Sequence, residues 1–154
     1  KIFEGLQLNF IESARSGFPY SVTCDNCSGA NRPSLIGDPF ANLAPDRLLN
    51  PAAFSTNTAT FSTFVNPAGR TIFFGNLGRN TFRGPAIYST DGSIFKNTKL
   101  RESLEMQLGF EFFNLFNHAN YTVPSNNVNS GDFGSIRFNA MPGRVVQYRL
   151  KFIF

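Results

Sequence analysis

The stretch that decides the fold is Arg144-Val145-Val146-Gln147-Tyr148-Arg149-Leu150-Lys151-Phe152-Ile153-Phe154, in which apolar and polar side chains alternate. Successive side chains of a β-strand point to opposite faces, so the alternation predicts a strand near residues 144–154. Its predicted apolar face consists of Val146, Tyr148, Leu150, Phe152 and Phe154. A tilted strand needs about 9–11 residues to cross a bilayer, so this one is long enough. The alternation alone fits an amphipathic strand of a soluble antiparallel sheet equally well.

A second stretch, near residues 101–113, has the same design. Its apolar positions are all even-numbered, and they are Leu104, Met106, Leu108, Phe110 and Phe112. The odd positions carry Glu105, Gln107 and Glu111, which suit the polar interior of an outer-membrane barrel. Because both stretches keep the same phase, we expect their apolar faces on one side of an antiparallel sheet.

Two weaker alternating stretches predict further strands near residues 3–12 and 86–97. A tight turn is expected between Asn97 and Arg101, and Asp91-Gly92 is expected to mark a bulge. Each predicted strand is antiparallel to its neighbour in sequence. The fold class predicted is all-β, a single β-barrel segment over residues 1–154. Its antiparallel barrel-type strands, with two long loops between them, form an open sheet that other chains or missing strands complete.

The segments between these strands, residues 19–85 and 117–143, predict two long loops, because they are rich in Gly, Pro, Asn, Ser and Thr without sustained periodicity. One helical turn is expected over residues 44–51, with Asp46 as its cap and Pro51 as its stop. A short strand is expected within residues 134–138. In a barrel the short turns face the periplasm and the long loops face outward, so these loops would lie outside the cell.

The composition favours a folded β protein, since 42% of the 154 residues are hydrophobic and 16% are charged. The net charge of +4 comes from scattered Lys and Arg side chains, so no nucleic-acid partner is expected. No apolar run approaches eighteen residues, which excludes a membrane-spanning helix.

Chemistry-bearing residues are sparse. Cys24 and Cys27 form the single cysteine pair, in a polar, turn-prone setting. We expect a local disulfide that closes a surface loop in an oxidising compartment, with free thiols as the alternative, because the strand-to-helix context of a redox dithiol is absent. A zinc site would need more ligands than the lone His118 supplies, so no metal is expected. The Gly-rich stretch from Gly75 to Pro85 lacks the Lys-Ser/Thr ending of a phosphate loop, so no nucleotide is expected either. We therefore expect no catalytic residue, no cofactor and no enzyme activity.

The stretch Phe110 to His118, the motif Gly75-Asn76-Leu77-Gly78-Arg79-Asn80 and the closing Leu150 to Phe154 together resemble the C-terminal part of TonB-dependent receptor-like, Oar-like outer-membrane proteins. The resemblance implies a barrel scaffold without catalytic residues. Such receptors also have an N-terminal plug and many more strands, so the chain is expected to be a piece of a longer protein.

Three functions follow as hypotheses. The first is a structural fragment, in the outer membrane or released outside the cell, that pairs with copies of itself through open strand edges into an oligomer, tube or filament. The second is the C-terminal part of a lipid-embedded barrel for TonB-dependent nutrient uptake. The third is a soluble β-rich module whose long loops bind glycans.

Overall fold

The computed structural model describes residues 4–25, 27 and 31–154. Its contacts divide the chain into two compact units, where the sequence predicted a single segment. The first, here called the sheet unit, comprises Lys1–Arg15, Ala86–Asn120 and Asn139–Phe154; the second, the loop unit, comprises Ser16–Pro85 and Tyr121–Phe138. The all-β fold class is confirmed, and the sheets are not closed into a barrel.

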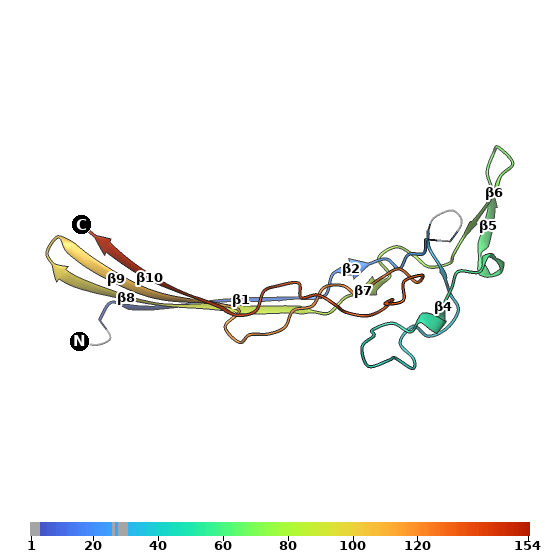
Figure 1. Ribbon diagram of the computed structural model, residues 1–154. Coiled ribbons are helices and arrows are strands. Elements are labelled where there is room, and N and C mark those ends of the chain that lie inside the picture. Colours follow the sequence, from blue (N-terminus) through green and yellow to red (C-terminus); the bar gives the residue numbers. More distant parts are fainter. Residues whose placement is uncertain (1–3, 26, 28–30) are drawn as a thin grey trace. The chain divides into compact units, whose positions relative to one another are not determined.

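The sheet unit is a four-stranded antiparallel sheet (Figure 1). Its strands, in spatial order, are β1 (Leu6–Arg15), β8 (Ile87–Arg101), β9 (Leu104–Phe113) and β10 (Val145–Ile153). Every adjacent pair is antiparallel. Relative to the predicted ranges, β1 begins and ends later, β8 ends later and β9 begins later; residues 1–3 lie outside the described part of the chain.

The predicted turn between Asn97 and Arg101 is wrong, because β8 continues through it. Asn97 pairs with Gln107 and Lys99 with Glu105, and the turn lies at residues 102–103. The sequence indicated a turn here because the side chains of this segment are polar and show no apolar alternation. Their backbone groups nonetheless pair with β9. The only register shift between β8 and β9 falls between Lys99 and Arg101, so the bulge predicted at Asp91-Gly92 is also wrong.

The loop unit contains three short strand pairs. They are β2 (Pro19–Tyr20) with β7 (Phe82–Arg83), β3 (Ser34–Leu35) with β4 (Phe54–Ser55), and β5 (Ser62–Val65) with β6 (Thr71–Phe74). Phe54 packs edge-on against Phe82 and Phe133, with ring centroids 5.9 and 5.1 Å apart. The core contains Tyr20, Val22, Leu49, Ala53, Phe54, Leu77, Phe82 and Phe133. The predicted long loops therefore fold around a core of their own.

Two single-turn 3-10 helices also lie in the loop unit, at Pro51–Ala53 and Thr58–Thr60. The helical turn predicted over residues 44–51 is thus misplaced, because Pro51 begins a turn where it was expected to end one. The Asn50 side chain caps it by accepting from the Ala52 N–H at 3.0 Å, and proline is well suited to a first helical position. The strand predicted within residues 134–138 is reduced to an isolated bridge between Ser135 and Arg47. No helix in the described part of the chain is long and apolar enough to span a membrane.

Candidate membrane-facing surface

The register of β9 and β10 joins the two predicted apolar sets into one surface. Leu150 lies directly opposite Leu108, and Tyr148 lies opposite Phe110. Residues directly opposed in antiparallel strands point to the same face, so the expectation that both sets share one side is confirmed. The Phe110 and Tyr148 rings touch edge to face, with centroids 6.2 Å apart. Phe154 and Leu104 are the exceptions, because the pairing of β10 with β9 ends at Ile153 and Glu105.

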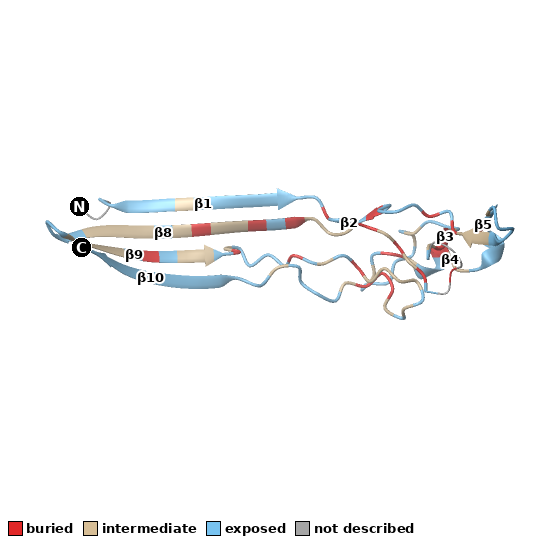
Figure 2. Cartoon of the chain, turned by 90° about the horizontal axis from the view of Figure 1, so that it is seen from above, coloured by how far each residue is buried: buried red, intermediate tan, exposed pale blue. Residues whose placement is uncertain are grey.

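The same surface, here called the apolar face, continues across β8 and β1. Ile94 of β8 lies opposite Phe110, and Leu8 of β1 lies opposite Ile94. The side chains that form it are Leu6, Leu8, Phe10, Ile94, Met106, Leu108, Phe110, Phe112, Val146, Tyr148, Leu150 and Phe152. Tyr148 is 75% exposed and Leu8 is 55% exposed, and Figure 2 shows both outer strands exposed along most of their length. A contiguous apolar surface of this kind marks an interaction with a membrane or a partner.

The opposite side of the sheet, here called the polar face, is linked by side-chain hydrogen bonds across the strands. Arg149 donates from Nη2 to Gln107 Oε1 at 3.3 Å, and Gln107 donates from Nε2 to Asn97 Oδ1 at 2.9 Å. Nearer the β1 edge, Asn9 Nδ2 donates to Ser93 Oγ at 3.1 Å. These bonds satisfy amides and a guanidinium without burying them in hydrocarbon, as the interior of an outer-membrane barrel requires.

Gly109 explains how an aromatic ring fits on the polar face. It lies between Phe95 and Arg149 in the pairing order, and a Cβ at this position would come within 2.6 Å of the Phe95 ring. Without a side chain here, the ring covers the glycine, and Arg149 Cζ lies 4.9 Å from the ring centroid. The glycine that interrupts the predicted polar face therefore makes room for a cation–π contact.

Charge is distributed unequally between the two faces. The polar face carries Asp91, Lys99, Glu105, Glu111, Arg149 and Lys151. On the apolar face, Glu12 accepts a hydrogen bond from the Thr90 hydroxyl, and Lys96 donates to the Glu4 carbonyl oxygen. The two faces therefore differ in charge as well as in hydrophobicity, and lipid is the environment that suits the apolar one.

Asparagines complete the end of the sheet where β9 stops. Asn114, with φ of 52°, donates from Nδ2 to the His118 carbonyl at 2.9 Å, while its Oδ1 accepts from the His118 N–H at 2.9 Å. The Asn114 N–H itself donates to Asp91 Oδ1 at 2.9 Å. His118 lies edge-on to the Tyr88 ring with centroids 5.8 Å apart.

Asn120 replaces a strand partner for β8. Its amide donates to the Tyr88 carbonyl at 2.7 Å and accepts from the Tyr88 N–H at 2.8 Å, and the residue is 1% exposed. Sequence reasoning missed this role, since a polar residue in a polar segment gives no periodic signal. The recurrence of asparagine at positions 114, 117 and 120 was the available clue.

Asn120→Ala is expected to destabilise the sheet unit by about 1–3 kcal/mol, because it removes both hydrogen bonds that the buried Asn120 side chain makes with the N–H and carbonyl of Tyr88. Equilibrium unfolding in urea measures the loss, and amide exchange at Tyr88 locates it. Asn9→Ala in the same sheet unit is the matched control, because the Asn9 side chain bonds to the side chains of Gln7 and Ser93 and its loss leaves no backbone group of a strand unpaired. Equal losses of stability in the two variants would contradict the conclusion that Asn120 replaces a strand partner for β8.

The other candidate residues of the sequence have structural surroundings. Cys24 and Cys27 are joined by a disulfide bond. In the Gly-rich stretch, the Asn76 side chain accepts from the Leu35 N–H at 2.7 Å and donates to the Leu35 carbonyl at 3.1 Å, so it supports strand β3. Within the described residues, no three His, Cys, Asp or Glu side chains gather as a metal site would require.

Two side chains of the loop unit have shifted pKa values. Burial raises the pKa of Tyr20 to about 12. The pKa of Asp132 lies below its usual value, chiefly because the Ser130 hydroxyl donates to it, with further help from Ser125 and from Arg137, whose Nε lies 3.1 Å from Oδ2. Burial acts in the opposite direction. The Asp132 carboxylate accepts hydrogen bonds from the Ser125 and Ser130 hydroxyls.

An antiparallel sheet with one apolar and one polar face, connected by a tight hairpin and by long loops, defines the wall of an outer-membrane β-barrel protein. The chain matches the family model described as "Outer membrane beta barrel domain" over residues 1–147, and it belongs to this family. It is accordingly a protein of the bacterial outer membrane. No curated protein and no solved structure gave a significant match.

Proposed function

We propose that this chain is a non-catalytic structural protein, derived from a TonB-dependent receptor-like barrel, that assembles with copies of itself through its open strand edges. The observation that supports the proposal best is the state of the two outer strands. In the described part of the chain, β1 pairs only with β8, and β10 pairs only with β9. A strand that pairs on one side presents unpaired N–H and carbonyl groups, which recruit another strand.

The direction of the strands fits such a contact. Each strand of the sheet is antiparallel to the next, so β1 and β10 also run in opposite directions. The β10 edge of one copy can therefore add to the β1 edge of the next and continue the antiparallel order. Pairing of even-numbered residues with even-numbered residues keeps both apolar faces on one side, whereas a shift by one residue would mix the faces.

The number of strands favours several copies. At about 4.8 Å between strands, four strands form only part of a wall, and small membrane barrels have about eight. Two different edges make a heterologous contact, which yields a closed ring if the rotation closes and a tube or filament if it does not. The apolar face then lies against membrane lipid, or against other subunits where lipid is absent.

Electron microscopy of the chain purified without detergent tests the proposal, with ordered polymers as the expected result. Tyr148→Pro should abolish them, because proline cannot donate to a strand partner, while Tyr148→Phe should preserve them.

Because Tyr148→Pro could also unfold the sheet, a second experiment cross-links the edges directly. Asn9→Cys mixed with the odd-position variants Gln147→Cys, Arg149→Cys and Lys151→Cys should form a disulfide between copies with one of them, and Asn9→Cys mixed with Tyr148→Cys should not. A folded monomer from the native chain, with no cross-link in any mixture, would overturn self-assembly.

The second candidate function is the C-terminal wall of a barrel for TonB-dependent nutrient uptake. The resemblance of Phe110 to His118 and of the closing strand to such receptors favours it. Further strands of the same polypeptide would then complete the sheet. A detergent-solubilised monomer whose gel migration changes on heating, without polymers, would favour this function over assembly. A soluble glycan-binding module, the third hypothesis, has no use for so extended an apolar face.

A further inference from the structure

The Cys24–Cys27 disulfide belongs to a small buried cluster of the loop unit. Cys24 and Cys27 are 1% and 5% exposed, and the third buried member is Phe61. Phe73 of strand β6 and Val128 pack against them. Side chains from three segments that are distant in sequence therefore meet around the two sulfur atoms.

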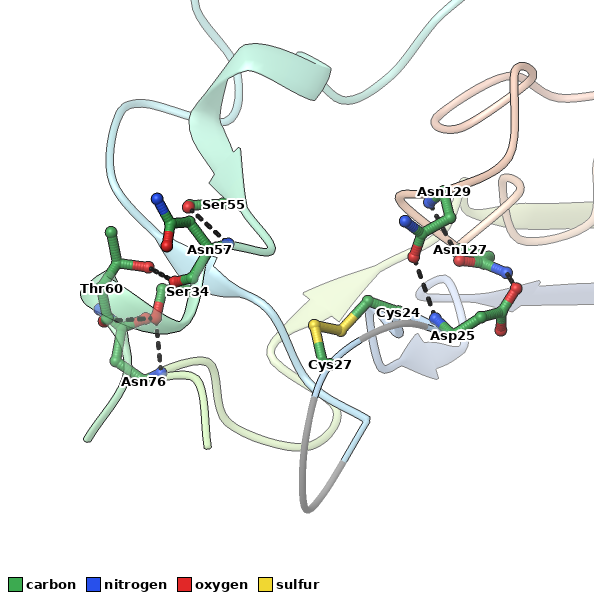
Figure 3. Close-up of a disulfide and its surroundings, with 10 residues drawn as sticks. All are labelled: Cys24, Asp25, Cys27, Ser34, Ser55, Asn57, Thr60, Asn76, Asn127 and Asn129. Carbon is green, nitrogen blue, oxygen red and sulfur yellow. Dashed lines mark hydrogen bonds between the residues drawn. A yellow bond between two sulfur atoms is a disulfide. The ribbon is translucent and has the colours of Figure 1, made fainter. Parts of the chain in front are cut away.

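Hydrogen bonds tie the chain beside the disulfide to residues 126–129 (Figure 3). The Asp25 N–H donates to Asn129 Oδ1 at 3.0 Å, and Asp25 Oδ2 accepts from Asn127 Nδ2 at 2.6 Å. In the backbone, the Thr23 N–H donates to the Asn126 carbonyl at 2.8 Å, and the Val128 N–H donates to the Thr23 carbonyl at 2.9 Å. One short segment thus holds another that lies about a hundred residues later in the chain.

The effect of this disulfide must be local. A ring closed by cysteines three positions apart removes little chain entropy from the unfolded state, so it adds little global stability. It does fix Cys24, which directly precedes Asp25, the residue that bonds to both Asn127 and Asn129. The cluster has few other buried residues. Breaking the disulfide therefore removes much of the packing that orders the chain around Asp25.

We propose that the Cys24–Cys27 disulfide is a redox-sensitive lock that holds residues 126–129 and the β5–β6 hairpin in one arrangement. A dithiol such as dithiothreitol opens the lock by donating two electrons and two protons. The sulfur–sulfur bond breaks, two cysteine thiols form, and dithiothreitol closes into its own cyclic disulfide. Residues 126–129 then lose the fixed position of Asp25, while the larger core around Phe54 and Phe133 stays intact.

Amide hydrogen exchange of the full chain tests the lock. Treatment with dithiothreitol, with thiol formation verified by mass, should raise exchange at Thr23 and Val128 about tenfold or more. A double variant, Cys24→Ser with Cys27→Ser, should show the same rise without any reductant, which covers the case of a buried bond that resists reduction. The Ile36 N–H, bonded to the Ala53 carbonyl at 2.9 Å beside the larger core, is the internal reference and should not change.

Asp25→Ala with the disulfide intact provides a second arm. It removes the carboxylate bond to Asn127 but keeps the ring, so it should raise exchange at Val128 less than the double variant does. Unchanged exchange at Thr23 and Val128 in the double variant would overturn the proposal. So would an equal rise at Ile36, because that result would mean general unfolding of the loop unit.

Discussion

Leu150→Arg is expected to cost about 2–4 kcal/mol of stability when the chain is embedded in a bilayer, the cost of a cation on the lipid side of a barrel strand near the membrane centre. Leu150 lies within the apolar face, directly opposite Leu108, and is 57% exposed. Urea-driven unfolding from lipid vesicles measures the difference from the native chain. The loss should appear as a lower midpoint with an unchanged slope, because the substitution alters stability and not the surface exposed on unfolding.

Gln147→Arg is the matched control, three residues away on the other face of the same strand. Gln147 lies opposite Glu111 on the polar face, so the added cation meets a carboxylate in a hydrated setting. We expect a change within about 0.5 kcal/mol, as for surface substitutions generally. Comparable losses in the two variants would show that the two faces of β10 do not lie in different environments.

Gly75→Ala is expected to disrupt the loop unit, at a cost of about 3 kcal/mol. A Cβ at this buried position would lie 2.1 Å from the Pro33 carbonyl oxygen and 2.4 Å from that of Arg32. These atoms belong to the backbone, so they cannot turn away as a side chain could. Urea unfolding and protease sensitivity of residues 31–85 should both report the loss.

Gly131→Ala is the control for this prediction, because a Cβ there would meet nothing within 4 Å. Its effect should stay within about 0.5 kcal/mol. If Gly75→Ala were equally harmless, the close packing of the Gly-rich stretch against Arg32 and Pro33 would be refuted.

The long strands could be predicted because their side chains alternate over many residues. Even positions of β9 and β10 are apolar, so the sequence predicted that both sets lie on the same side of the sheet, although it did not predict which residues pair. The end of β8 could not be predicted in this way. Asn97 and Lys99 belong to the polar face, and their pairing depends on Gln107 and Glu105 of the next strand, which no local pattern reveals.

The loop unit was harder to predict, for a related reason. Strands of two to four residues are too short to show a period, and the core of this unit joins Tyr20, Phe54 and Phe133 from widely separated positions. Asn120 was missed because its side chain alone makes the hydrogen bonds to Tyr88 that a neighbouring strand would otherwise make, and no sequence pattern indicates this. The composition of these segments indicates that polar and aromatic contacts must hold them in place. Only the folded chain shows which residues make those contacts.

In a barrel wall, even-numbered residues of β9 and β10 are expected to face lipid and odd-numbered residues to face the polar interior. Spin labels placed singly at positions 145 to 153 in the outer membrane test it most directly, by their collisions with oxygen and with a water-soluble nickel complex. The account predicts a two-residue period along β10, with labels at Tyr148 and Leu150 most accessible to oxygen and labels at Gln147 and Arg149 most accessible to nickel. No alternation, or alternation of the opposite phase, would contradict it.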